Sequence, residues 1–449
     1  MLAAMPKDRI DIAGWLRGHT EDGDRLWALN ERANRTVRWG HWFHVASACL
    51  FCLCVAMPIS FTEVSGGILM GVSLARLYAT WRLYPALLSR PVVLVGLLYL
   101  AYSLLGIVWS VNPGLGVAEV DALRWFMLVP AFWPLRHLRR WFVLCIVVSY
   151  AVAYGAQTVQ AMAFEFGWEN LDFDAYSNRI SCWFMPASAG SIFLAAFGLH
   201  LPVALDPKHA LRWPARAFAV LALFSVIATG ARGAWIAGVL FFVLALLRAV
   251  WLTKHRVRVL ILGAVIAAIA LPAVWLTLGD RIRSRVDEGR WEVEQALEND
   301  NYATSTGARI NMWIWAGRAF AANPIVGTGT GGYRTWVESA QRERGISEES
   351  QPIERNAHGA YVHIAATQGL VGLALVALLI AALILESWPS RLDHETYQAG
   401  ITGAIIAVMI VGIFATVHLH TQTAAVLGTF AALSMRSSNR YRPPDSGCP

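Results

Sequence analysis

Long apolar segments separated by short polar links recur along most of the chain. Each is close to the roughly 20 residues that a helix needs to cross the hydrocarbon core of a bilayer. We therefore predict an all-α polytopic membrane protein with about twelve transmembrane helices. The predicted spans are 42–60, 64–80, 92–110, 124–137, 141–163, 181–203, 215–230, 233–252, 258–279, 358–386, 396–418 and 420–435.

One long polar stretch, residues 280–357, interrupts this pattern. It is too long for a structureless connection. Residues 292–297 favour a helix. Residues 309–320 predict an aromatic-rich amphipathic helix that can lie in the membrane interface, and Asn323-Pro324 ends it. The predicted organisation is a cytoplasmic N-terminal segment 1–41, transmembrane helices 42–279, a periplasmic catalytic loop 280–357, further transmembrane helices 358–435, and a cytoplasmic tail 436–449.

Composition and charge agree with a membrane location. The chain is 56% hydrophobic and 15% charged, whereas soluble domains have about 25% charged residues. The net charge of +7 is explained by Lys and Arg gathered in alternate links, which places those links and both termini in the cytoplasm. A nucleic-acid partner is therefore not needed to explain the charge. Residues 1–40 are polar and Arg-rich, unlike a cleaved signal peptide. The predicted outer links are 111–123, 164–179, 229–233, 280–357 and 418–421.

Several arginines fall on the predicted outer side. Arg232 lies in a Gly-rich turn between two spans, Arg309 opens the aromatic helix, and Arg318 lies further along it. Arg179 and Arg124 each stand at the start of a span. The planar guanidinium makes paired, charge-assisted hydrogen bonds to a diphosphate. Each of these arginines also has an alternative interpretation. Arg232 can be a snorkelling side chain, and the arginines of the aromatic helix can contact lipid headgroups. Arg179 and Arg124 can simply flank their spans.

Histidines gather on the same side. His358 begins the tenth span, and an imidazole can take up a proton near neutral pH. Glu354, one helical turn earlier, is positioned to orient it; the alternative is an interfacial histidine bonded to the backbone. His363, His418 and His420 lie nearby in the predicted topology. The His-X-His pair is a weak metal signal, because no cysteine or acidic partner is close in sequence.

Residues 327–333, GTGTGGY, only superficially resemble a phosphate-cradling loop. The stretch lacks the Lys-Ser/Thr ending and a preceding strand. We interpret it as turn chemistry after Pro324. Nothing else suggests nucleotide binding, so any energy source must arrive with the substrate.

Three stretches follow one another around the polar loop: TGARGA at 229–234, RINMWIWA at 309–316 followed by PIVGTG at 324–329, and NAHGAY at 356–361 followed by QGLVG at 368–372. In this order, over roughly residues 215–390, they resemble signatures of the O-antigen ligase family and its superfamily. Gly359 stands where the family commonly has Asn, and Gln368 where it commonly has Glu.

The resemblance implies a GT-C-like glycosyltransferase in the bacterial inner membrane with a periplasmic active site. The donor would be an O-antigen polysaccharide on undecaprenyl diphosphate, and the acceptor a sugar hydroxyl of lipid A–core among membrane lipids. No nucleotide sugar, metal or other cofactor is expected, and attack opposite the diphosphate would invert the anomeric centre. The implied roles are His358 as general base, Arg232 and Arg309 as diphosphate ligands, and Arg179, Arg124, Arg318 and Tyr361 as substrate-binding residues.

Other functions compete with this interpretation. An O-antigen polymerase or a protein O-oligosaccharyltransferase of the same superfamily differs only in the acceptor. A twelve-span transporter or lipid flippase is the alternative of another class. It predicts two related halves with functional polar residues at mid-membrane, whereas here the halves are dissimilar and the polar residues cluster on one side.

Overall fold

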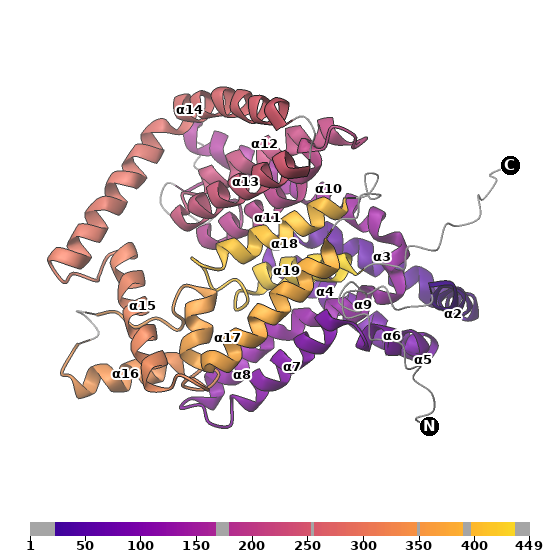
Figure 1. Cartoon of the computed structure of the whole chain (residues 1–449), viewed down its shortest axis with the longest axis horizontal. Coiled ribbons are helices and arrows are strands. Elements are labelled where there is room, and N and C mark those ends of the chain that lie inside the picture. The colour runs from indigo at the N-terminus through magenta and orange to yellow at the C-terminus, as the bar shows by residue number, and fades with distance from the viewer. Residues whose placement is uncertain (1–22, 168–178, 253–255, 348–350, 389–396, 436–449) are drawn as a thin grey trace.

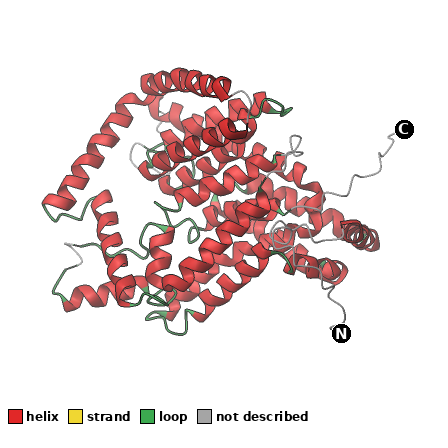
Figure 2. Cartoon of the chain, viewed as in Figure 1, coloured by secondary structure: helices red, strands yellow, loops and turns green. Residues whose placement is uncertain are grey.

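A computed structural model describes residues 23–167, 179–252, 256–347, 351–388 and 397–435, and within them it contains helices and loops but no strands (Figure 2). The elements up to the long polar stretch are α2 (Gly23–Thr36), α3 (Arg38–Cys54), α4 (Ile59–Ala75), α5 (Leu77–Thr80), η1 (Trp81–Leu83), α6 (Tyr84–Leu88), α7 (Pro91–Leu105), α8 (Pro113–Ala122), η2 (Leu123–Met127), α9 (Leu128–Phe132), η3 (Trp133–Leu138), α10 (Arg139–Phe166), α11 (Pro186–Leu205), α12 (Arg212–Ala228) and α13 (Arg232–Leu252). The remainder are α14 (Arg256–Glu298), α15 (Ser305–Ala322), α16 (Tyr333–Glu343), α17 (Ala360–Ser387), α18 (Gln398–Val411) and α19 (Thr421–Ser434).

Every apolar segment predicted as a span coincides with helical structure. By length and composition, four helices in the described residues can cross a membrane, or up to five if the bent pair Leu77–Leu88 and Pro91–Leu105 counts as one. These findings agree with an all-helical membrane protein, and the number of twelve spans stays a prediction. The four helices are Pro113–Phe166, Pro186–Leu205, Arg232–Trp251 and Ala360–Ser387.

Helix α11 forms the centre of the bundle, packed against α12, α13 and α18 (Figure 1). Nearly all its side chains are buried. Its close approach to α18 depends on glycine, because a Cβ at Gly198 would lie 2.5 Å from the Gly403 carbonyl oxygen. Small residues at a helix crossing let backbones pack tightly in this way.

The polar stretch is a helical extension along one side of the bundle, formed by the second half of α14 and by α15 and α16 (Figure 1). Helix α14 does not end at Gly279, where the apolar run ends, but continues to Glu298. The two predicted helices in this stretch are confirmed, since 292–297 lie in α14 and 309–320 in α15. Thr304 caps α15 by accepting a hydrogen bond from the Gly307 amide at 3.0 Å, and Asn323 terminates the helix as expected.

This extension has a small hydrophobic core of its own. Trp315 of α15 and Tyr333 of α16 are each only 1% exposed, and they pack with Ala357 and with Ala366 of α17. The Tyr333 hydroxyl also donates a hydrogen bond to the Met312 carbonyl at 2.8 Å. The aromatic face of α15 therefore packs on protein, which fixes this helix relative to α17.

The glycine-rich stretch 327–333 packs against α17 and forms backbone hydrogen bonds with it. Helix α17 is broken at Gly369, where φ is 62° and ψ is −156°. The amides of Thr328 and Gly329 donate to carbonyls of the helix on one side of the break, each at 2.9 Å, and the Leu370 amide donates to the Pro324 carbonyl at 2.8 Å. Backbone groups freed by a break inside a membrane protein need such partners. The turn chemistry was predicted correctly, but its role in completing α17 was not.

Candidate active site

Arg232 begins α13 and reaches across to α14. Its Nη2 lies 2.5 Å from Glu292 Oε2, and its Nη1 donates to the Arg285 carbonyl at 3.3 Å. Gly230, with φ +65°, makes the tight turn before it. Gly289 lets the guanidinium approach α14, because a Cβ there would lie 2.6 Å from Arg232 Nη1. Arg232 is thus a positioned side chain that holds two helices together.

Glu292 ties this arginine to the start of α15. Its carboxylate is only 4% exposed, and Oε2 also accepts hydrogen bonds from the Thr306 hydroxyl and from the Thr306 amide, the latter at 3.2 Å. This one carboxylate therefore joins α13, α14 and α15 around the place where Arg309 stands.

The region carries more positive than negative charge. Glu292 is committed to Arg232, and Glu288 pairs with Arg285. Each of these two carboxylates is thus paired with one arginine, and two further arginines of the cluster have no paired carboxylate. The four arginines that interact electrostatically here are Arg179, Arg232, Arg285 and Arg309.

Arg309 and Arg179 are the other two arginines of the cluster, and the carboxylate of Glu292 acts on both of them from a distance. Neither makes a hydrogen bond or an ion pair with another residue in the described part of the chain, and both are partly buried. Burial lowers the pKa of the Arg309 guanidinium, and the charges of Arg232 and Arg179 lower it further. Burial and the charge of Arg285 likewise lower the pKa of Arg179. A bound anion would relieve this repulsion, so the cluster suits a multiply charged anion such as a diphosphate.

His358 faces this cluster from the loop before α17. Its backbone is left-handed, with φ +47°, and its amide donates to Asn356 Oδ1 at 3.1 Å. Asn356 Oδ1 also accepts from the Thr416 hydroxyl at 3.0 Å. A non-glycine residue held in this conformation is strained and is typical of functional sites. Asn356, anchored to the segment before α19, holds the backbone that carries the imidazole.

Burial lowers the pKa of the His358 imidazole to about 4, and the nearby charges of Arg309 and His420 add to this effect. The ring is therefore neutral near pH 7 and is able to accept a proton. The prediction that Glu354 orients His358 is wrong. Residues 351–359 are not helical, so the two residues are not one helical turn apart, and Glu354 is exposed.

The two departures from the family signatures have local explanations. A Cβ at position 359 would lie 2.8 Å from the Ile413 carbonyl oxygen, so a larger residue than Gly359 requires the backbone to shift. Gln368 is buried, and its Nε2 donates to Ser103 Oγ on α7 at 3.1 Å. A neutral amide serves this contact without burying a charge.

The structure brings together Arg179, Arg232, Arg309 and His358. Arg318 lies nine residues beyond Arg309 on α15, about two and a half turns, and therefore on the opposite face. It is exposed and stacks over Trp315, with its guanidinium carbon 4.5 Å from the ring centroid. Its contribution to substrate binding stays a prediction that the cluster geometry does not support.

Arg124 and Tyr361 also make their contacts with residues outside the arginine cluster. Arg124 pairs with Glu63 at 2.5 Å and with Asp121, so its charge is already balanced. The Tyr361 hydroxyl donates to the Met409 carbonyl of α18 at 2.7 Å. Both contacts have an evident role in packing, and substrate binding by these two residues stays untested.

Residues on α14 were missed by the sequence interpretation. Arg285, Glu288 and Glu292 follow the spacing of one helix face, and this periodicity is visible in the sequence once α14 is known to continue. Asn356 and His420 were not assigned to the site because their contacts join segments distant in sequence. Within the described residues, no three His, Cys, Asp or Glu side chains are grouped so that they could hold a metal ion.

The described residues thus combine apolar helices with a cluster of arginines and a nearby imidazole. Comparison with known proteins gives a family match for part of the chain. Residues 217–377 match the family model described as O-antigen ligase, a range that includes Arg232, Arg309 and His358. This match agrees with the resemblance that the three sequence stretches carry.

A relative from Haemophilus influenzae (strain ATCC 51907 / DSM 11121 / KW20 / Rd), described as an uncharacterized protein, is 28% identical over 162 residues. The alignment covers 36% of this chain and 40% of the relative. It thus spans less than half of either protein.

Proposed function

We propose that this protein is an O-antigen ligase. It transfers a polysaccharide from undecaprenyl diphosphate to a sugar hydroxyl of lipid A–core, at the periplasmic face of the bacterial inner membrane, with both chain termini in the cytoplasm. The match of residues 217–377 to the O-antigen ligase family model supports this reaction class, and the excess of positive charge beside a neutral imidazole supports the assignment of roles.

In this reaction Arg309 and Arg179 bind the donor diphosphate, and Arg232 holds the arrangement through Glu292 while contributing its own charge. The C1–O bond to the diphosphate breaks as negative charge develops on the leaving oxygen. Cations positioned in advance stabilise that charge without reorganising. The acceptor hydroxyl is the poorer partner, so His358 takes its proton as it attacks C1 from the opposite side. The anomeric centre is inverted.

Donor binding strengthens the base. Burial and the positive charge of Arg309 disfavour the His358 imidazolium. The diphosphate adds negative charge beside Arg309, and a nearby anion favours the protonated imidazole. The pKa of His358 therefore rises when the donor is bound, which brings the base closer to the pH at which it works.

The observation that carries the proposal is the position of Arg309, whose charge acts on both the arginine cluster and His358. The direct genetic test is to delete the protein and complement with wild type or with His358→Ala. We expect unmodified lipid A–core and accumulated lipid-linked polymer in the deletion and in the variant. Fully capped lipid A–core in the deletion would refute the proposal.

The same experiment separates the related alternatives. A polymerase would leave lipid A–core carrying a single repeat unit, and a protein O-oligosaccharyltransferase would leave lipopolysaccharide intact while a glycoprotein loses its glycan. A flippase would leave the lipid-linked glycan on the cytoplasmic face, where periplasmic glycosidases do not reach it.

A further inference from the structure

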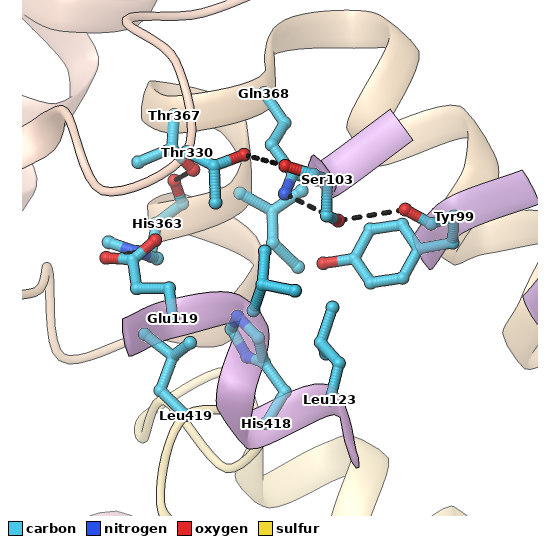
Figure 3. Close-up of a pocket in the computed structure, with 12 residues that line it drawn as sticks. Tyr99, Ser103, Glu119, Leu123, Thr330, His363, Thr367, Gln368, His418 and Leu419 are labelled. Atoms are coloured by element: carbon cyan, nitrogen blue, oxygen red, sulfur yellow. Dashed lines mark hydrogen bonds and ion pairs between the residues drawn. The ribbon is translucent and has the colours of Figure 1, made fainter. Parts of the chain in front are cut away.

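A small buried cavity lies where α7, α8, α17 and the segment before α19 meet (Figure 3). Its volume is about 10 Å³, which is room for a single water molecule. The polar residues that line it include Tyr99, Ser103, Glu119, Thr330, His363 and His418. None of them has a role in the transfer step described above.

The cavity contains a buried acid beside a buried imidazole. His363 Nε2 lies 3.3 Å from Glu119 Oε1, with the two side chains 1% and 6% exposed. Glu119 Oε2 accepts a hydrogen bond from the Gly331 amide at 2.9 Å. The His418 ring lies beyond, 6.2 Å from the His363 ring centroid.

Buried polar atoms converge on this space without a hydrogen-bond partner in the described residues. They are both ring nitrogens of His363, His418 Nδ1 and Gln368 Oε1, so the 3.3 Å contact of His363 Nε2 with Glu119 does not have hydrogen-bond geometry. An orphaned buried polar atom calls for an explanation, and a water held by two to four such partners is the ordinary one. A water in this space would also bridge the imidazoles of His363 and His418, which make no hydrogen bond to each other.

Further imidazoles connect this cavity to the candidate active site. His420 is two residues from His418. Burial lowers the pKa of His418 to about 3, and the nearby imidazoles of His363 and His420 add to this effect. On its other side His420 lowers the pKa of His358, and its Nε2 lies 3.4 Å from the Thr416 hydroxyl. The line runs from His358 through His420, His418 and His363 to Glu119.

The charges at the two ends of this line differ in sign. At the outer end burial and the charge of Arg309 disfavour an imidazolium at His358. At the inner end stands the carboxylate of Glu119, in buried surroundings where charges interact strongly. A proton acceptor on the inner side of His358 would keep the base free during the transfer step.

We propose that Glu119 and His363 form an internal proton acceptor, supplied from His358 through His420 and His418. The proposal rests on the proposed transferase function. The acceptor O–H bond breaks as its oxygen bonds to C1, and the C1–O electron pair leaves with the diphosphate. The proton passes to His358, and each imidazole in turn takes one proton and gives one up, with the bridging water between the last two. After the products leave, the proton returns along the same line to solvent.

The test compares Glu119→Gln with Ser103→Ala in a purified transfer assay. Glutamine keeps the shape and can still accept from the Gly331 amide, but it removes the negative charge. Ser103 lines the same cavity and bonds Gln368 without titrating. We expect Glu119→Gln to lower kcat about 10- to 100-fold, with KM for both substrates within about twofold. Ser103→Ala should retain kcat within about twofold.

His418→Ala gives a second readout if Glu119→Gln does not fold. The truncation leaves space for a small base, so imidazole added to the buffer should restore at least part of the lost kcat. A kcat for Glu119→Gln within about twofold of wild type, a loss confined to KM, or a folded His418→Ala that imidazole does not rescue would each overturn the relay. Absence of transfer by the wild-type protein would instead refute the transferase function itself.

Discussion

Removing the charge of Arg309 should damage two parts of the reaction at once. Arg309→Gln takes away one of the two arginines of the cluster that have no ion-pair partner in the described residues, and also a charge that acts on His358. Loss of one positioned group that stabilises a leaving oxyanion costs about 3–4 kcal/mol, or 10²–10³-fold in rate. We therefore expect kcat/KM for the donor to fall by this factor at neutral pH.

The second effect is on the base. The His358 pKa is lowered from 6.5 to about 4, with burial as the largest cause and Arg309 the next. A drop of this size disfavours the imidazolium by about 3 kcal/mol. Arg309→Gln removes the second cause and leaves the first, so the pKa rises part of the way toward 6.5. The acid limb of kcat/KM, which reports the free enzyme, should move to higher pH.

The assay measures initial transfer rates of purified protein in nanodiscs across the acid range. Arg342→Gln is the matched control, because this exposed arginine of α16 belongs to the same extension but has no contact with the cluster. Arg309→Lys separates charge from geometry, since Lys cannot make the paired contact. An Arg309→Gln rate within about threefold of wild type, or an acid limb that does not move, would refute this account of the site.

Four further predictions follow from other contacts. In the wild-type protein the acid limb of kcat should lie at higher pH than that of kcat/KM, because the bound diphosphate raises the His358 pKa above its value of about 4 in the protein alone; coincident limbs would exclude this coupling. Glu292→Gln should lower kcat/KM at least tenfold, about 1.4 kcal/mol, because Arg232 and Thr306 are held less firmly, which steady-state kinetics with both substrates would measure. Glu386→Gln should lower the melting temperature strongly, since it removes the negative charge that faces the fully buried Arg90, at a cost of about 3–5 kcal/mol; replacement of both residues by apolar ones should recover most of it. Gly329→Ala should impair folding, because its φ is +88° and a Cβ would lie 2.4 Å from the Ser110 Cα, whereas the open position Gly317 should tolerate the same change in a thermal melt.

The helices themselves were largely predictable, because apolar runs such as those of α13 and α17 identify buried or lipid-facing segments without tertiary information. The end of α14 was not. Hydropathy marks where a helix leaves an apolar environment, and the helix continues beyond Gly279 with polar side chains that favour the same backbone. The break at Gly369 was equally hidden, because the loop amides that complete it come from more than thirty residues earlier.

For the site, side-chain chemistry predicted which residues belong to it better than it predicted how they are arranged. Arg232, Arg309 and His358 were chosen for what their side chains can do, and the fold brings them together. Helical periodicity alone could have shown that Arg318 lies on the opposite face of α15 from Arg309, since the two are nine positions apart. Glu354 was assigned by assuming a regular helix, and the left-handed backbone of His358 rules that out.

The most direct measurement of the central claim is transfer by the purified protein in proteoliposomes. Wild type and His358→Ala would be given a lipid-diphosphate-linked polysaccharide and lipid A–core, with no nucleotide added. We expect the wild type to form the polysaccharide–lipid A–core product with inverted anomeric configuration, and the folded His358→Ala protein to form at least about 100-fold less. Equal product from both proteins would contradict the assignment of His358 as the base, and no product from the wild type would contradict the function.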